Sequence, residues 1–275
     1  MIKIITDTAA DIPPEILSEK NIVAVPLGVY FYKNNTEMSI DSVEEFWKTM
    51  AADTFLPKTS APSPGSFAES FATAQSEGYE GVICITLASE LSGTYEAALV
   101  GAQEVKNFPI EVIDSKSVTL GEGLLVLFAS ELANNGLSFQ EIVDATCKKR
   151  EKIKILALLD TLEYLKLGGR IGALSSMIGT LLSVKPIIEI KFGALSTVSK
   201  QRTRSRGIDF LTDLLKTYTN LEKVAVVHSM APDIDSITES VTGILGTEDV
   251  LTSYIGPIVG TYSGPGTIGF CLMEK

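Results

Sequence analysis

The fold class is decided by one stretch, Gly81-Val-Ile-Cys-Ile-Thr-Leu-Ala-Ser-Glu-Leu-Ser-Gly-Thr-Tyr95. Its first part, Val82–Thr86, is a short apolar run, which is typical of a strand buried on both faces of a parallel sheet. Its last part, Ser92-Gly-Thr-Tyr95, has the small polar residues that begin helices, and helical character continues to about Lys106. A buried strand followed directly by a helix is the repeating unit of α/β proteins.

The rest of the first half repeats this alternation of strands and helices. Strands are expected at Lys3–Thr6, Val23–Tyr32 and Ile110–Ile113. Helices are expected at Asp41–Ala51, Gly65–Gln75, Val118–Asn134 and Ser138–Lys149. Pro64 suits the first position of the second of these helices, with Ser63 as its cap. The pattern predicts βαβ units around a parallel sheet.

The second half mixes hairpins with crossovers, which predicts an α+β arrangement. Its expected strands are Ile153–Leu159, Lys185–Ile190, Ala194–Ser199, Lys223–His228, Val250–Tyr254 and Gly266–Leu272. Its expected helices are Thr161–Lys166, Leu174–Leu182, Thr203–Tyr218 and Ile234–Leu245. We therefore expect an α/β protein of two domains, with an N-terminal parallel-sheet domain at residues 1–153 and a C-terminal α+β domain at residues 154–275.

Composition excludes several classes of function. The chain has 275 residues, 45% of them hydrophobic, and a formal charge of −11, so a nucleic-acid partner is not expected. The three cysteines are far apart in the sequence and form no CxxC pair. The chain opens on an expected strand without an export signal, and no apolar run is long enough to span a bilayer. We therefore expect a cytoplasmic protein. A single histidine, His228, leaves little room for metal sites or Ser-His-Asp catalysis, and we interpret it as structural.

A candidate anion site lies at the predicted helix start after the buried strand. Ser92 and Thr94 offer hydroxyl donors, Gly93 allows close approach to the backbone, and a helix start offers free N–H groups. An ordinary helix cap explains the same residues. Thr59, in the Pro-rich loop Thr59-Ser-Ala-Pro-Ser-Pro-Gly65, would add a hydroxyl if this loop folds over the sheet edge, although turn residues of this kind are common.

Three further motifs have both a functional and a structural interpretation. Gly264-Pro-Gly-Thr-Ile-Gly269 matches GxGxxG by letter, but too few residues follow it for a nucleotide-binding helix, so we expect a tight turn. Arg170 follows the helix-ending Gly168-Gly169 and is either a solvated residue or a cation near a bound anion. The basic run Lys200–Arg206 is either a solvated helix start or a docking patch for an acidic partner or phosphate.

Taken together, these segments resemble the DegV family of fatty-acid-binding proteins across essentially the whole chain. The resemblance rests on the order and spacing of Thr6-Asp-Thr-Ala-Ala-Asp11, Lys58-Thr-Ser-Ala-Pro62, Leu91-Ser-Gly-Thr-Tyr95, Ile113-Asp-Ser115, Gly121-Glu-Gly123, Leu162-Glu-Tyr-Leu165, Gly168-Gly-Arg-Ile171, Lys185-Pro186 and Gly264-Pro-Gly266.

The resemblance implies a carrier that holds one long-chain fatty acid, such as palmitate, and presents it to a separate fatty-acid kinase. It implies a carboxylate site of Thr59, Ser92, Gly93 and Tyr262, with Arg170 toward the same end. Tyr262 stands where the family usually has His, so this position stays neutral. Arg202 is expected to face the kinase.

The apolar segment at 174–182 and the following strand supply the candidate lining of the acyl tail: Leu174, Met177, Ile178, Leu181 and Ile188. No catalytic residue, metal or cofactor is expected. Two alternatives remain open, namely a small-molecule kinase subunit and a regulatory module that responds to lipid.

Overall fold

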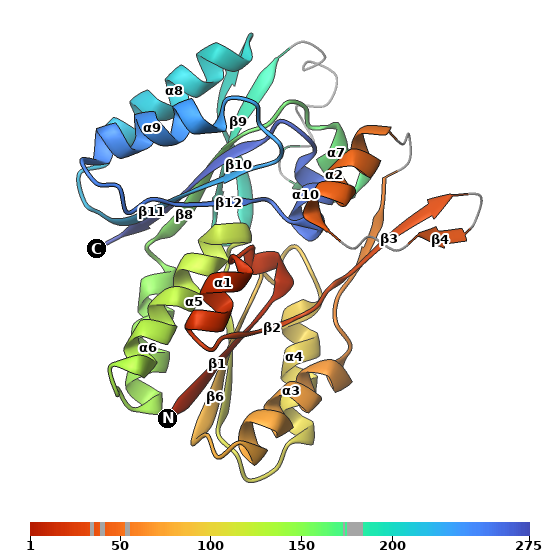
Figure 1. Ribbon diagram of the computed structural model, residues 1–275, viewed down its shortest axis with the longest axis vertical. Coiled ribbons are helices and arrows are strands. Elements are labelled where there is room, and N and C mark those ends of the chain that lie inside the picture. The colour runs from red at the N-terminus through yellow and green to blue at the C-terminus, as the bar shows by residue number, and fades with distance from the viewer. Residues whose placement is uncertain (34–35, 39–41, 53–55, 173, 175–183) are drawn as a thin grey trace.

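The computed structural model describes every residue except 34–35, 39–41, 53–55, 173 and 175–183. Its strands form three sheets in the described part of the chain, two of which organise the molecule (Figure 1). The mixed α/β fold predicted from the sequence is confirmed. The division into domains at residue 153 stays a prediction, although the second large sheet begins with the strand at Ile153.

The first sheet is parallel and has the order β2-β1-β6-β7. Its strands are β1 (Ile2–Asp7), β2 (Val23–Val25), β6 (Gly81–Thr86) and β7 (Ile110–Asp114). One face packs against α3 (Pro64–Ser76) and α4 (Thr94–Glu104), and the other against α5 (Thr119–Asn134) and α6 (Phe139–Arg150). Since β6 is buried along its whole length, it has the continuous apolar run of a strand covered on both sides.

The second sheet is mostly antiparallel and has the order β10-β9-β8-β13-β11-β12. Its strands are β8 (Ile153–Leu158), β9 (Lys185–Lys191), β10 (Ala194–Gln201), β11 (Leu221–His228), β12 (Leu251–Tyr254) and β13 (Ile268–Glu274). The helices α8 (Arg204–Lys216) and α9 (Ile234–Leu245) cover one face. The other face points toward the first sheet.

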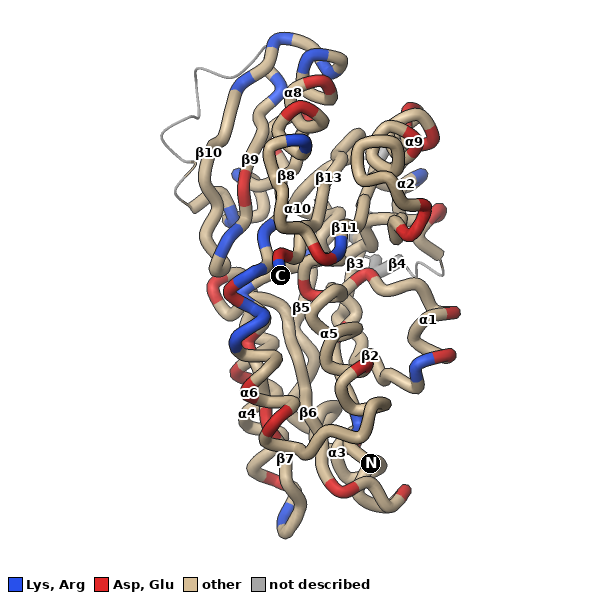
Figure 2. The backbone as a smooth tube through the Cα atoms, turned by 90° about the vertical axis from the view of Figure 1, so that its left-hand side faces the viewer, with Lys and Arg blue, Asp and Glu red and all other residues tan. Residues whose placement is uncertain are grey.

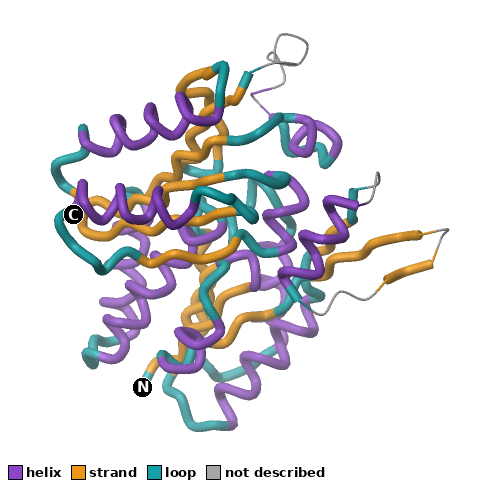
Figure 3. Tube along the Cα trace, turned by 45° about the horizontal axis from the view of Figure 1, so that its top comes forward, coloured by secondary structure: helices purple, strands orange, loops and turns teal. Residues whose placement is uncertain are grey.

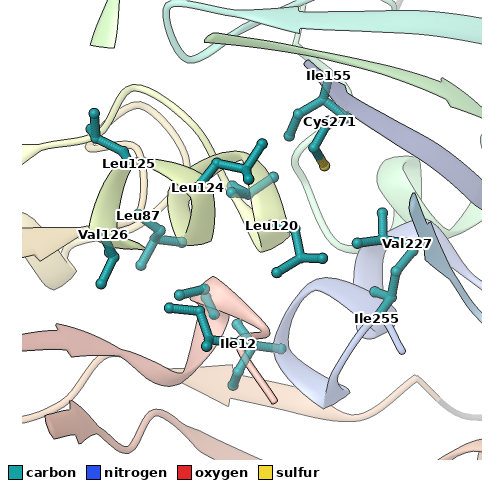
Figure 4. Close-up of a cluster of buried hydrophobic side chains, with 14 of the residues drawn as sticks. Ile12, Leu87, Leu120, Leu124, Leu125, Val126, Ile155, Val227, Ile255 and Cys271 are labelled. Carbon is teal, nitrogen blue, oxygen red and sulfur yellow. The ribbon is translucent and has the colours of Figure 1, made fainter. Parts of the chain in front are cut away.

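Helix α5 lies between the two large sheets. Its side chains join one continuous buried cluster with both of them, and Figure 4 shows Leu120 and Leu124 of α5 beside Ile155 of β8 and Cys271 of β13. The apolar character of α5 around most of its circumference follows from this position, because a helix packed on two sides has no fully solvated face.

The third sheet is small and has the order β4-β3-β5. It consists of β3 (Gly28–Lys33), β4 (Thr36–Met38) and β5 (Lys58–Ser60), and the β3–β4 pair extends away from the rest of the molecule (Figure 3). The prediction of one strand at Val23–Tyr32 was therefore wrong. Pro26 has no N–H to continue the ladder, and the next amide, of Leu27, instead donates to the Thr8 hydroxyl at 3.0 Å.

Helix α2 (Val43–Ala52) and four short helices complete the described elements: η1 (Thr8–Ala10), α1 (Pro14–Glu19), α7 (Glu163–Leu167) and α10 (Pro257–Ser263). The sequence analysis missed α10. It packs closely against α2, where Gly260 has no side chain and a Cβ would lie 2.8 Å from the rings of Phe46 and Trp47. None of the helices in the described ranges is long and apolar enough to cross a membrane. The predicted helix at Leu174–Leu182 lies, except for Leu174, outside the described residues.

Candidate functional site

A cavity lies where the carboxyl ends of the first sheet's strands meet the inner face of the second sheet. The strand order of the first sheet reverses between β1 and β6, and open α/β sheets bind ligands at such points. The cavity has a volume of about 170 Å³. Arg170 is the one charged side chain among the described residues that line it.

The lining brings together residues from both halves of the chain. From the first half come Leu27, Thr59, Ser60, Ala61, Leu87, Leu91, Ser92, Gly93, Val118 and Thr119. From the second half come Ile155, Ala157, Leu159, Leu165, Arg170, Ile188, Ile190, Leu195, Val227, Ile255, Ile258, Val259, Tyr262, Ser263, Thr267 and Gly269. Thus the five residues expected at a carboxylate site all line this one cavity.

Thr59 and Tyr262 form the closest polar contact at the cavity. The Thr59 Oγ1 and the Tyr262 phenol oxygen lie 2.6 Å apart, although the residues are 203 positions apart in sequence. Thr59 is held in β5 by pairing with Val29 of β3, and Tyr262 is on α10. Both groups are neutral hydroxyls, and each can donate to an oxygen of a ligand.

Ser92 and Gly93 lie at the beginning of α4. The Ser92 hydroxyl is 2.9 Å from the Thr94 hydroxyl and accepts from the Thr94 N–H at 3.3 Å. Gly93 is the N-cap of α4, no side chain caps the helix, and nothing lies within 4 Å of the position that a Cβ would take there. This open space beside a helix N-terminus suits an anion.

Arg170 is fixed at the same cavity by its neighbours. It follows Gly169, whose φ of +72° turns the chain sharply after α7. Its Nη1 donates to the Gly168 carbonyl at 2.8 Å and its Nε to the Leu91 carbonyl at 3.3 Å. Its guanidinium carbon lies 4.7 Å from the centre of the Tyr262 ring. The cation is therefore positioned beside Tyr262 and beside the segment that leads into Ser92.

Only one of the residues expected to line the acyl tail is among the described residues that line this cavity. Ile188 of β9 lines the cavity, whereas Leu174 is buried and is not among the described lining residues, so a contact of Leu174 with the acyl tail stays a prediction. Met177, Ile178 and Leu181 lie outside the described residues. The sequence analysis missed three cavity-lining residues, Ala157, Gly269 and Val227, which are paired in one row with Ile188 across four neighbouring strands.

The basic run at residues 200–206 is divided by the fold. Arg204 forms a two-bond ion pair with Asp233, with both N···O distances at 2.8 Å, so this residue has a structural role. Lys200, Arg202 and Arg206 are exposed. Figure 2 shows basic positions where the chain passes from β10 to α8. His228 is buried at the end of β11, with its ring 4.5 Å from that of Tyr254, as expected for a structural residue.

The cavity offers binding groups and no catalytic pair. Its described lining contains hydroxyls, backbone groups, apolar side chains and one guanidinium, with no His, Cys, Asp or Glu to serve as a base or nucleophile. No group of three or more His, Cys, Asp or Glu residues in the described ranges is arranged to hold a metal ion. The geometry therefore fits an elongated apolar ligand with an anionic end.

Fold and site together define an α/β protein with a ligand cavity between its two large sheets. A family model described as an uncharacterised protein of the DegV family matches residues 1–275. A DegV domain-containing protein of Clostridium acetobutylicum is 33% identical over 280 residues, which cover 100% of this chain and 99% of the relative. The chain belongs to the DegV family.

Solved structures with the same fold carry names that refer to fatty acids. A stearic-acid-binding protein from Eubacterium ventriosum has 28% identity and a TM-score of 0.90, and a fatty-acid-binding DegV protein from Thermus thermophilus has 25% identity and a TM-score of 0.89. Each comparison covers 100% of this chain and 99% of the other. The fatty-acid-binding DegV protein of Bacillus subtilis has 28% identity and a TM-score of 0.88 over the same shares.

Proposed function

We propose that this protein binds a long-chain fatty acid in the cavity between its sheets. The observation that carries the proposal is the convergence of Thr59, Ser92, Tyr262 and Arg170 at one mainly apolar cavity. The hydroxyls and the helix start would bind the carboxylate, and the guanidinium would balance its charge. The fatty-acid-binding relatives of the same fold support this choice of ligand.

The tail would supply most of the affinity. Burial of an acyl chain contributes roughly 0.8 kcal/mol per methylene, or on the order of 11 kcal/mol for about 14 methylenes before the loss of free motion on association. The cavity volume of about 170 Å³ is close to that of an engineered cavity of about 150 Å³ that holds benzene.

The protein would act as a carrier and not as an enzyme. It would present the carboxylate, near the exposed Gly93, to a separate fatty-acid kinase that transfers phosphate from ATP, forming an acyl phosphate. Arg202 is exposed and would contact that kinase. We place this exchange in the cytoplasm, where ATP is present and where Cys84, Cys147 and Cys271 would remain the free thiols that they are here.

Mass spectrometry of protein purified under native conditions tests the ligand. An acyl chain co-purifying at about one per protein supports the proposal, and an empty cavity that does not take up added palmitate contradicts it. Ser92→Ala should reduce retention, whereas Ser76→Ala, on the exposed end of α3, is the matched control and should not. Unchanged retention and unchanged phosphorylation in Ser92→Ala would remove Ser92 from the site.

Reconstitution with a fatty-acid kinase and ATP separates the carrier from its alternatives. Acyl phosphate that forms only when kinase and loaded protein are both present supports the carrier. Phosphorylation by this protein alone would indicate the kinase-subunit alternative. Binding without any acyl phosphate would indicate a regulatory module that responds to lipid.

A further inference from the structure

Three carboxyl groups meet behind the cavity. Asp7 and Asp11 flank the short helix η1 (Thr8–Ala10), and Glu122 lies on α5. Asp7 and Glu122 have no exposed surface, and the charge of Asp7 acts on Glu122. The Glu122 Oε1 accepts from the Thr6 hydroxyl at 3.0 Å, whereas its Oε2 is buried without a partner. We call Asp7, Asp11 and Glu122 the acid trio.

The acid trio contacts the wall of the ligand cavity directly. The Asp7 Oδ2 accepts from the Leu87 N–H at 2.9 Å, and the Asp11 Oδ2 accepts from the Thr119 hydroxyl at 2.6 Å. Both Leu87 and Thr119 line the cavity. The Asp11 Oδ1 accepts from the N–H of Gly256, the residue that precedes α10 and therefore Tyr262. One layer of residues thus separates the trio from the cavity.

No cation balances the acid trio within the described residues, and none of its members forms an ion pair there. The strands packed against the acid trio bring two thiols and one further carboxyl near it: Cys84 of β6, Cys271 of β13 and Asp114 of β7. Asp114 is itself paired with Lys116 at 2.8 Å. Three adjacent carboxyls without a counterion cannot all be ionised, so the trio holds protons at neutral pH.

The direction of the pKa shifts agrees with this geometry. Burial raises the pKa of Asp7 and that of Asp11 to about 7. The hydrogen bonds that these carboxyls accept lower both pKa values, but by less than burial raises them. Burial, and then the charge of Asp7, raise the pKa of Glu122 well above its ordinary value. The number of protons on the trio is therefore sensitive to any new charge placed nearby.

A second cavity gives one member of the acid trio, Asp11, access to solvent. It measures about 510 Å³ and is lined by Asp7 and the partly exposed Asp11, together with the exposed residues Thr8, Glu15 and Tyr254. Its described lining contains no Lys, Arg or His. Protons can therefore reach Asp11 without passing through the ligand cavity.

We propose that the acid trio is a proton-linked regulator of anion binding in the ligand cavity. This inference rests on the proposed function, because it requires an anionic ligand. A carboxylate in the cavity repels an ionised trio through the Leu87 and Thr119 wall, so that binding draws a proton onto the trio. Arg170 offsets part of this repulsion. Higher pH then favours release of the ligand, and lower pH favours its retention.

Calorimetry with decanoate, a soluble fatty acid that stays ionised between pH 6 and 8, tests the inference. The titrations are performed in two buffers of different ionisation enthalpy, with decanol as the uncharged analogue. We expect proton uptake on binding at pH 7. The Kd for decanoate should rise at least about threefold from pH 6 to pH 8; one linked proton can change it by at most tenfold per pH unit. The Kd for decanol should not change.

Two conservative variants locate the effect. Glu122→Gln keeps an acceptor for Thr6 and offers an N–H to Asp7, and Asp11→Asn keeps an acceptor for Gly256. Both should reduce proton uptake and flatten the pH dependence. Asp213→Asn, which removes one carboxyl that is 72% exposed on α8, is the matched control and should behave as wild type.

Several outcomes would overturn the inference. A wild-type Kd for decanoate that is constant from pH 6 to pH 8, without proton uptake, would refute it while leaving the proposed function intact. Equal pH dependence for decanol would also refute it. If the variants do not fold, the wild-type protein alone still tests the inference, because the pH dependence of its Kd for decanoate can be compared with that for decanol. Failure of decanoate, decanol and palmitate alike to bind at any pH would overturn the proposed function, and the inference with it.

Discussion

Replacement of Gly168 by alanine tests how far the carboxylate site depends on the position of Tyr262. A Cβ on Gly168 would lie 2.5 Å from the Tyr262 Cε1 and still closer to Cδ1, which is nearer than real Cβ contacts. The ring would have to move, because the Tyr164 carbonyl lies 3.1 Å from the same Cβ and leaves little room for the backbone to yield. Movement of the ring would break its contacts with both Thr59 and Arg170.

The magnitude follows from those two contacts. Loss of the 2.6 Å hydrogen bond to Thr59 costs about 1 kcal/mol. Loss of the guanidinium contact at 4.7 Å costs about 0.5–1 kcal/mol. The free energy of unfolding should fall by about 1.5–2 kcal/mol. Because fatty-acid binding needs the same groups in place, the affinity should fall by up to about 10- to 30-fold, at about 1.4 kcal/mol per factor of ten.

Competition with a fluorescent fatty acid measures this change, and thermal unfolding shows whether the variant is folded. Gly243→Ala is the matched control, since a Cβ there meets nothing within 4 Å and its helix should become slightly more stable. A folded Gly168→Ala protein that binds palmitate within twofold of wild type would show that the Tyr262 position does not determine affinity.

Three further predictions concern single features of the structure. Tyr262→Phe keeps the ring over Arg170 but removes the hydroxyl, so palmitate binding should weaken only about fivefold in the same competition assay. Arg202→Ala should leave binding intact but slow acyl-phosphate formation, whereas Lys148→Ala on α6 should change neither; equal rates for both variants would refute a role for Arg202. The raised pKa of the fully buried Asp7 means that the folded state binds its proton more tightly than the unfolded state, so the urea midpoint should fall as pH rises from about 4 to about 7. A midpoint that rises through this range would contradict that sign.

The local signals in the sequence predicted most elements because they depend on neighbouring residues only. Ser63 caps α3 by accepting the Ser66 N–H, and Pro64 is its first residue, as expected. The apolar run at Val82–Thr86 is fully buried. The helix α10 was missed because Pro257–Ser263 has only seven residues, including Gly260, and is stabilised by packing against other elements and not by its own propensity.

The composition of the cavity wall could not be predicted in the same way. Inward-facing residues of a strand follow from alternation, but the neighbours of that strand do not. The last strand, β13, is inserted between β8 and β11, so that Gly269 lies beside Ala157, 112 residues earlier in the chain. The resemblance to a known family brought Thr59 and Tyr262 into one hypothesis, which local patterns could not do.

The short motif Gly121-Glu-Gly123 on α5 determines how closely this helix packs against its neighbours. A Cβ on Gly121 would lie 2.8 Å from Ile155, which lines the ligand cavity, and a Cβ on Gly123 would lie 2.8 Å from the Ala10 carbonyl between Asp7 and Asp11. The two glycines therefore allow α5 to approach β8 and η1 closely, and Glu122, between them in the sequence, has no exposed surface. The same helix contacts the cavity wall and the acid trio. A structural change at either place can therefore reach the other through the closely packed side chains of α5.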